Sequence, residues 1–472
     1  MRLPYLVTCA FAASIAILSP LACGGSSASS KPSADAGGSD ATGSPETSTG
    51  AKDSAAATDS PADTPPDAVD NGAPSTNYPA PHPAMPQLVN NAKGVVLTSP
   101  KVYLVFYPGY APTPTTVTQL QDFAQKMGTS TFWSKTTQEY GVGALAYGAT
   151  ITLTGQTPPT NISSSDIQTW VAAQIQAGTF GTPDPQAIYT VFYPQSTTIT
   201  QPNPVSTLLM SPTSCVNFGG YHDNTTASAD GGTGKSFAYA VIPTCSTSVD
   251  DLTAVLSHEW VEASTDPFLT SGGTFTLSGG PSAAFYSADK DHLVWDLLGG
   301  GEAGDLCEPE SPAVYITPAD IGHMVQRTWS NLQALGSHDP CAPDIAGAFF
   351  DAAPVLTETV TFSSTITGTI TSKGVTIPVG QSKTIEVDLF SDGDPGGPWT
   401  VTAEDVLYKY YGSYGIPKSL SFAWDRTQGL NGEKLHLTVT VTSASIIAGA
   451  HAFMITSSNS SRQAVWPGLV VE

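Results

Sequence analysis

Beyond residue 86, the pattern of apolar residues along this chain changes near Ile345, and the change restricts the folds that the chain can adopt. Before it, apolar strands such as Val102 to Tyr107 alternate with segments whose apolar residues recur at helical spacing. After it, only short alternating runs remain, separated by Gly, Asp, Asn and Pro. We therefore expect an α/β domain with a mixed sheet at residues 86–345, followed by an all-β, antiparallel sandwich of immunoglobulin-like type at residues 346–472.

The first 22 residues predict an export signal. Arg2 gives the positive start, and the apolar run from Leu3 to Leu18 is short for a membrane span. The following Leu-Ala-Cys-Gly resembles a bacterial lipobox, in which Cys23 carries the lipid. A plain cleaved signal is the alternative, but no good A-x-A site precedes the mature region. We expect an exported protein, lipid-anchored at the bacterial outer membrane or cell surface.

Residues 23–85 predict a disordered tether. They are mainly Ser, Ala, Asp, Gly, Pro and Thr, with almost no large apolar side chain. Such a segment cannot bury enough apolar surface to offset the entropy lost on ordering. We expect a spacer that holds the folded part away from the membrane.

The charge of the chain bears on its partners. Only 12% of the residues are charged, and the formal net charge at pH 7 is −23. A charge this negative argues against nucleic acid and anionic membrane surfaces as partners. Contact with a membrane is therefore expected through the N-terminal lipid anchor.

Four cysteines remain beyond the export signal and the lipobox: Cys215, Cys245, Cys307 and Cys341. In an exported chain they predict two disulfides, for which three pairings exist. Proximity in the sequence favours Cys215–Cys245 and Cys307–Cys341. None of the four has C-x-x-C spacing, which argues against a cysteine-based zinc site or redox motif.

The segment SHEWVEASTDP, from Ser257 to Pro267, begins like the helix of a zinc peptidase. Glu262 stands where the second histidine of H-E-x-x-H would be. On a helix, His258 and Glu262 point the same way one turn apart, so both can hold a divalent ion. Glu259 takes the place of the general base that activates water in such peptidases. The alternative is an ordinary exposed helix, because H-E-x-x-E alone is a weak signal.

Another ligand must come from elsewhere in the chain. The glycine-rich segment LVWDLLGGGEAGDLCEPE offers Glu302 and Asp305, which converge if the segment turns helical there. Asp266, one turn beyond Glu262, is a second option, and His222, in the predicted loop CVNFGGYHDN, is a third. His222 is also a candidate catalytic residue that stabilises an oxyanion. The ligand set predicts Zn²⁺, with Mn²⁺ or another divalent metal as the alternative.

The order of these pieces resembles the phosphate-induced protein 1 family of exordium-like secreted proteins. The resemblance covers residues 92–342 and includes WSKTTQEYG, SFAYAVIPTC, SHEWVEASTDP, the GEAGDLC segment and VQRTWSN. It implies a secreted protein with one H-E-x-x-E helix and a downstream E-x-x-D-x-C loop, here Glu302, Asp305 and Cys307. The chain departs from the family in its lipobox, tether and sandwich. The spacing before His222 is also longer than the family's compact C-G-x-H.

Two functions fit these observations. The first is a metallopeptidase-like hydrolase of the cell surface, with a zincin-like mixed sheet, that acts on a peptide, protein or cell-wall substrate. The second is a non-catalytic, lipid-anchored binding protein whose metal site is structural or vestigial. A serine hydrolase is disfavoured, because the chain contains no G-x-S-x-G.

Overall fold

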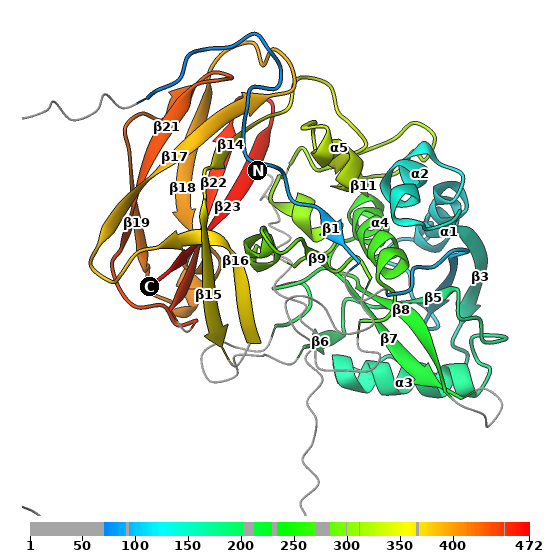
Figure 1. Ribbon diagram of the computed structural model, residues 1–472. Helices are drawn as coiled ribbons and strands as arrows, with labels where there is room; N and C mark the ends of the chain where they lie inside the picture. The colour runs from blue at the N-terminus through cyan, green and yellow to red at the C-terminus, as the bar shows by residue number, and fades with distance from the viewer. Residues whose placement is uncertain are drawn as a thin grey trace, which may run out of the picture. The chain divides into compact units, whose positions relative to one another are not determined.

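The computed structural model describes residues 70–90, 94–201, 212–228, 234–269, 284–298, 300–310, 312–364, 368–447 and 449–472. The predicted signal peptide, the lipidated Cys23 and most of the predicted tether lie outside these residues. The described chain is mostly β-sheet with few helices (Figure 1). None of its helices is both long and apolar enough to cross a membrane.

A five-stranded mixed sheet is the centre of the first part of the chain (Figure 1). Its strands, in spatial order, are β3 (Ala146–Thr152), β2 (Lys101–Phe106), β5 (Ala187–Tyr193), β8 (Lys235–Pro243) and β7 (Tyr221–Ala227). The first four are parallel, and β7 pairs with β8 in the antiparallel direction at one edge. The expected alternation of strands and helices around a mixed sheet is therefore present.

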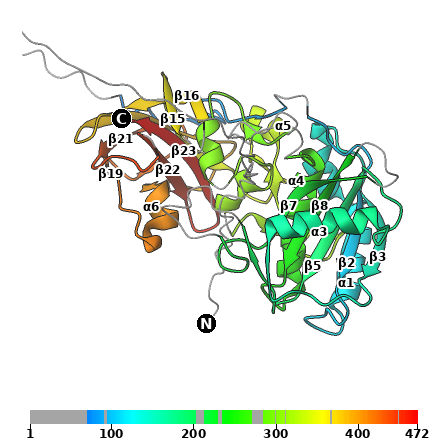
Figure 2. The same ribbon diagram turned by 90° about the horizontal axis from the view of Figure 1, so that it is seen from below.

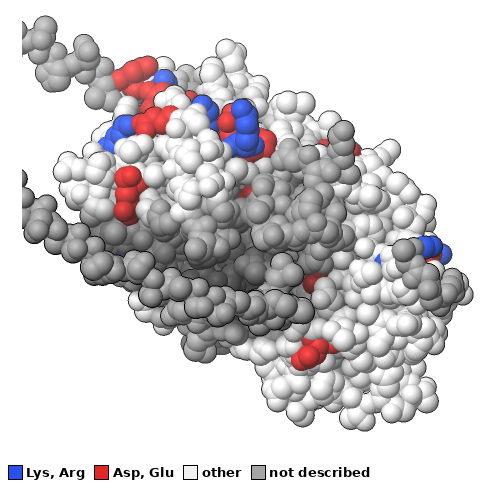
Figure 3. All heavy atoms as spheres, turned by 60° about the horizontal axis from the view of Figure 1, so that its bottom comes forward, with Lys and Arg blue, Asp and Glu red and all other residues white. Residues whose placement is uncertain are grey.

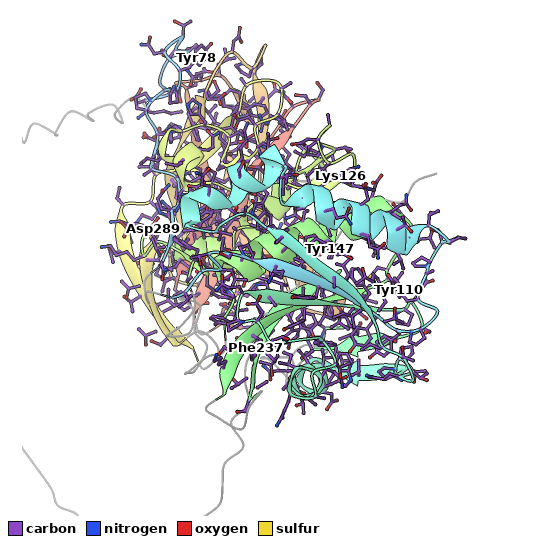
Figure 4. The ribbon with its side chains drawn as sticks, turned by 90° about the vertical axis from the view of Figure 1, so that its right-hand side faces the viewer. Tyr78, Tyr110, Lys126, Tyr147, Phe237 and Asp289 are labelled. Atoms are coloured by element: carbon purple, nitrogen blue, oxygen red, sulfur yellow. A yellow bond between two sulfur atoms is a disulfide. The ribbon has the colours of Figure 1, made fainter. Side chains whose placement is uncertain are left out.

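Helices cover both faces of this sheet (Figures 2 and 4). One face packs against α1 (Thr116–Met127), α2 (Thr131–Thr137) and α4 (Val249–Thr265), and the other against α3 (Ser164–Gln176). Because side chains of a strand alternate between faces, β5 contributes Phe192 to the first core and Tyr189 to the second. All seven residues of β5 are buried, as expected of a strand covered on both sides.

Helix α1 follows from its apolar spacing. Leu120, Phe123 and Met127 lie on one side of the helix and are buried, as the sequence predicts. Lys126 lies on the opposite, solvent side and pairs with Asp122 one turn earlier (Figure 4). The helix is thus held mainly by its apolar face, because an exposed pair of this kind stabilises by only about 0.5 kcal/mol.

Two sheets form the sandwich after residue 345. The four-stranded sheet has the order β14 (Phe350–Pro354), β17 (Ser382–Ser391), β21 (Lys434–Val441) and β19 (Leu420–Trp424). The six-stranded sheet has the order β15 (Glu358–Ser364), β16 (Gly368–Thr376), β23 (Gln463–Val471), β22 (Ala450–Ser458), β18 (Trp399–Asp405) and β20 (Gln428–Gly429). The expectation of a purely antiparallel sandwich is wrong at one place, because β16 and β23 pair in parallel. These strands lie far apart in the sequence, so no hairpin turn sets their direction.

Short elements complete the structure. Four two-stranded pairs are β1 (Leu88–Val89) with β9 (Ser287–Ala288), β4 (Asn161–Ser163) with β6 (Thr198–Thr200), β10 (Tyr315–Ile316) with β11 (Val325–Gln326), and β12 (Thr328–Trp329) with β13 (Cys341–Ala342). The short helices are η1 (Gln138–Tyr140), η2 (Leu293–Leu297), η3 (Asp305–Glu310), α5 (Asn331–Leu335), α6 (Val406–Tyr411) and η4 (Gly412–Tyr414).

The sandwich and the α/β part share a core within one compact unit, Asn71–Glu472. Trp466 of β23 packs edge-on against Trp295 of η2, which in turn packs against Trp329. Arg462, beside β23, and Arg327 both pair with the buried Asp339. The sandwich is therefore built into the unit that carries the α/β sheet.

The predicted tether is too long at its C-terminal end. Asn431 of the sandwich donates hydrogen bonds to the carbonyl oxygens of Ser75 and Asn77 and accepts one from the amide of Ala80. Met85 is also buried. Residues from Asn71 onward therefore belong to the compact unit, because Asn431 satisfies their backbone groups in a way that composition does not reveal.

The surface carries few charges. In Figure 3 most of the described surface on that face has no Lys, Arg, Asp or Glu, and the charged side chains form a few small groups. Much of the acidic charge is instead buried, in the cluster around α4 described next.

Candidate metal centre

Helix α4 positions the first ligands. Ser248 caps its N-terminus by accepting a hydrogen bond from the amide of Asp251, and the helix ends where Asp266 and Pro267 follow Thr265. His258 and Glu262 face the same side, with His258 Nε2 2.9 Å from Glu262 Oε2. Both side chains are buried, so the alternative of an ordinary exposed helix is excluded.

The glycine-rich loop before η3 closes over this pair. The backbone amides of Gly304 and Asp305 donate hydrogen bonds to Glu262 Oε1 at 2.9 and 3.2 Å. The carboxylate of Asp305 lies 3.5 Å from His258 Nε2. Gly304 approaches so closely that a Cβ there would lie 2.6 Å from His258 Nδ1 and 2.7 Å from Glu262 Oε1. The loop thus fixes one oxygen of Glu262. The other oxygen, Oε2, faces the imidazoles of His258 and His222.

His222 reaches the same place from the sheet. The prediction of a loop at this residue is wrong, because His222 lies on the edge strand β7, opposite Ala240 of β8. Its Nε2 is 3.2 Å from Glu302 Oε1, 3.9 Å from Glu262 Oε2 and 4.0 Å from Asp266 Oδ1. Glu302 and Asp305 do converge on the helix, as the sequence predicts, but each approaches a different histidine.

Both disulfides have the predicted pairing and support these segments. Cys215–Cys245 joins the segment before β7 to the residues after β8. Cys307–Cys341 joins η3 to β13. Each bridge therefore restrains a segment that carries a candidate ligand, namely His222 for the first and Asp305 for the second.

The potential ligands form two sets of three within the described residues. One set is His258, Glu262 and Asp305, and the other is His222, Asp266 and Glu302. A third group, Glu310, Asp339 and Cys341, does not qualify as a metal site. Its cysteine is in a disulfide, and its Asp339 is paired with two arginines.

Glu259 lies beside the two sets rather than within them. It is 2% exposed, and its Oε1 would be 2.7 Å from a Cβ placed on Gly220, the residue before β7. It accepts no hydrogen bond from the described residues, and its charge acts on His258 and Tyr221. Its carboxylate is thus left without a structural partner next to the candidate ligands.

Gln326 and Tyr286 belong to the site, although the sequence analysis assigned neither of them a role. Gln326 of β11 donates one hydrogen bond to His258 Nδ1, at 2.8 Å, and another to the carbonyl of Gly304. Tyr286 is buried near the carboxylates of Glu302, Asp305 and Asp266. Neither residue stands at motif spacing from the helix, so only the fold could place them there.

The electrostatics of the cluster disfavour its charged form. Burial, aided by neighbouring carboxylates, holds the pKa well above its usual range at four acids: Glu259, Glu262, Asp266 and Asp305. Burial also acts on Glu302, but the His222 imidazole holds the pKa of that carboxyl below its usual value. Burial lowers the pKa of His258, yet the charges of Glu259 and other acids raise it on balance. Without a cation, such a cluster must retain protons that a metal ion would displace.

All the candidate ligands are buried. The most exposed of the candidate ligands, Glu302, is 7% exposed. A cavity of about 400 Å³ lies between the sandwich and the α/β part, lined by Trp295, Trp466 and Lys373 among others, but by none of the candidate ligands. A second hollow, beside α2 and α5, does not reach the ligands either.

Comparisons with known proteins add little to this description. No family model matches the chain, and neither does any curated protein. Solved structures with some similarity include the titin M3 domain, at 12% identity over 21% of this chain and 85% of that one, with a TM-score of 0.14. Domains 1–6 of the surface layer protein SbsC match at 16% identity over 34% of this chain and 19% of that one, with a TM-score of 0.15. TM-scores this low support no argument about fold or function.

Proposed function

We propose that this protein is a metal-dependent hydrolase of metallopeptidase-like character. The observation that carries the proposal is the buried set of His258, Glu262 and Asp305, which lies beside a carboxylate, Glu259, with no structural partner among the described residues. A zincin-like α/β part, an immunoglobulin-like sandwich and membership of the exordium-like family belong to the same proposal. None of them is needed for its test.

The ligand chemistry fits a divalent cation. Zinc and manganese accept imidazole nitrogen and carboxylate oxygen together, and Zn²⁺ is the first choice. Bound there, the ion would act as a Lewis acid toward a carbonyl group and would acidify water. One adjustment is needed at His258. Its Nδ1 now accepts a hydrogen bond from Gln326, so Nε2 can bind a cation only if the ring proton moves to Nδ1 and the Gln326 amide turns its oxygen toward it.

The remaining residues have distinct roles in this proposal. Glu259 takes a proton from the attacking water, a role that fits a carboxylate beside the candidate ligands with no partner among the described residues. Glu262 is oriented by the amides of Gly304 and Asp305, so its second oxygen is available to the ion. His222 lies on the opposite side, on β7, where the proposal has it stabilise the developing oxyanion.

The test compares Glu259→Gln with wild type in the full, disulfide-bonded chain. Metal content is measured by mass spectrometry, and hydrolysis is measured on labelled casein and on a mixed peptide library. We expect Glu259→Gln to retain the metal and to lose about 10²- to 10⁴-fold in rate. Asp251→Asn, an exposed acid on the same helix, should match wild type in both. No bound metal in wild type after incubation with Zn²⁺ or Mn²⁺, or full activity in Glu259→Gln, would refute the proposal.

A second candidate is a non-catalytic surface protein with a structural metal. The burial of every ligand favours it, because structural sites are closed whereas catalytic sites keep an open position. In that case metal binding raises the unfolding temperature, but no peptide is cleaved. In both cases we propose an exported protein, lipid-anchored at the bacterial outer membrane or cell surface, that acts on or binds a peptide, protein or cell-wall component and does not bind nucleic acid.

A further inference from the structure

We propose that the centre holds two divalent cations, bridged by Glu262. The second cation would lie between His222, Asp266 and Glu302, next to the one held by His258, Glu262 and Asp305. His222 then serves as a ligand, and the second cation takes over the stabilisation of the oxyanion. This inference rests on the proposed metal-dependent function and extends it, because two-metal sites clamp both the attacking and the leaving oxygen of a hydrolytic reaction.

The spacing of the second set suits a cation. Two ligand atoms that share one ion at about 2.1 Å with a tetrahedral angle lie about 3.4 Å apart. His222 Nε2 lies 3.2 Å from Glu302 Oε1 and 4.0 Å from Asp266 Oδ1. These distances bracket the ideal value, so only small movements are required.

Glu262 connects the two sets. Its Oε2 lies 2.9 Å from His258 Nε2 and 3.9 Å from His222 Nε2. Its other oxygen is already fixed by two backbone amides. One carboxylate oxygen thus faces both imidazoles, which is the arrangement that a bridging ligand needs.

Two buried atoms of the second set have no hydrogen-bond partner among the described residues. They are Asp266 Oδ2, on a residue with no exposed surface, and His222 Nδ1. An orphaned carboxylate oxygen of this kind costs free energy unless a proton or a cation satisfies it. The nearby carboxyl of Glu302 is within hydrogen-bonding reach of Asp266, so the two acids compete for the same positive charge.

The charge balance also favours more than one ion. Five buried acids belong to or adjoin the two ligand sets, and none of them is paired with a lysine or arginine of the described residues: Glu259, Glu262, Asp266, Glu302 and Asp305. With neutral imidazoles, one divalent ion offsets two of the five negative charges and leaves three. A second ion leaves one, and Glu259, which belongs to neither set, is the proposed base.

The test counts metal ions per chain by mass spectrometry in the full, disulfide-bonded protein loaded with Mn²⁺ or Zn²⁺. We expect two equivalents in wild type, one in Asp266→Asn, one in His222→Gln, and loss of both in Glu262→Gln. Asp351→Asn, which alters a buried acid of the sandwich, is the matched control and should keep two. Spin coupling between two Mn²⁺ ions, detected by electron paramagnetic resonance, should be present in wild type and absent in Asp266→Asn.

The outcomes separate this inference from the proposed function. One equivalent in wild type, unchanged in Asp266→Asn and His222→Gln, would overturn the second site while leaving the hydrolase proposal intact. No metal at all would overturn both. Circular dichroism of each variant establishes folding. If Asp266→Asn does not fold, the metal content of His222→Gln decides whether the second site exists. This variant alters a strand residue and leaves the end of helix α4 unchanged.

Discussion

At the scale of single residues, Gly304 gives the sharpest test of the geometry of the centre. An alanine there would place its Cβ 2.6 Å from His258 Nδ1 and 2.7 Å from Glu262 Oε1, closer than such atoms pack. Overpacking of this kind costs about 1–3 kcal/mol, so Gly304→Ala should weaken binding of Zn²⁺ or Mn²⁺ by about 5- to 150-fold. Isothermal titration calorimetry on metal-free protein measures the change.

A matched glycine controls for the general effect of an added methyl group. At Gly393 the nearest atom to a new Cβ is Ala348 Cβ, at 3.4 Å, an ordinary contact. Gly393→Ala should therefore bind metal like wild type. Equal affinities in the two variants would show that the loop does not approach the ligands as described.

Because Asp351 of β14 is buried, we expect the free energy of unfolding to depend on pH. Burial raises its pKa to about 7, whereas an unfolded aspartate titrates near about 3.9. Between these values the folded state binds more protons than the unfolded state, so the free energy of unfolding falls as pH rises from about 4 to about 7. Asp351→Asn removes this pH-dependent contribution to the free energy of unfolding, which amounts to roughly 2–4 kcal/mol.

Urea unfolding of both proteins at several pH values tests the Asp351 prediction. The stability of wild type relative to Asp351→Asn should be greatest at and below about pH 4, should decline toward pH 7 and should level off above it. Parallel pH profiles for the two proteins would contradict the assigned shift.

The sequence predicted some site residues because their relation is local. His258 and Glu262 stand at helical spacing, so any helix through them brings their side chains together. Glu302 and Asp305 could be proposed because the glycine-rich segment that contains them is rich in carboxylates. Gln326 could not, because its contact with His258 joins residues 68 positions apart and no residue pattern connects them.

At the scale of elements, β7 shows why some predictions fail. The sequence YHDNTTA is polar and contains Asp and Asn, which are depleted in strands, so a loop was the natural expectation. Its strand conformation comes instead from pairing with the apolar β8. The strands β5 and β8 and the helices α1, α3 and α4 could be predicted, because their own residues carry the period of the element.

We expect the disulfide at η3 to slow the release of metal from the centre. Cys307 is two residues beyond Asp305 and is joined to Cys341, 34 positions away. Removing the bridge frees a loop of that length in the unfolded chain, which costs about 3–4 kcal/mol of stability. Because η3 also loses its anchor, the Cys307→Ser/Cys341→Ser variant should release metal to a chelator faster than wild type.

The other bridge is a control of nearly equal loop length. Cys215 and Cys245 are 30 positions apart, so their removal should cost a similar free energy of unfolding. Cys215 is seven residues from His222, however, so metal release should accelerate less. If both variants lose metal at the same rate, the effect is one of global stability and η3 has no special part in it.

At the scale of the whole molecule, the sandwich and the α/β part are expected to unfold together. The aromatic contacts from Trp466 to Trp295 and on to Trp329 cross from one part to the other, and Asp339 pairs with Arg327 and, across the same boundary, with Arg462. Apolar periodicity separated the pattern with helices from the pattern with strands alone near residue 345, but periodicity describes elements and not what they pack against. The shared core therefore had no counterpart in the sequence analysis.

Trp466→Ala tests this cooperativity. Trp466 is 3% exposed, so its truncation should cost about 3–5 kcal/mol. Thermal unfolding is followed by far-ultraviolet circular dichroism, which reports mainly the sheets, and by release of bound metal, which reports the α4 centre.

In wild type the two signals should change in one transition. In Trp466→Ala both transitions should move to lower temperature by the same amount, because a shared core links the two parts. Trp424→Ala, on the partly buried outer strand β19, should shift both signals less. Separate transitions, with metal release unchanged in Trp466→Ala, would show that the two parts fold independently and that the sandwich does not support the metal centre.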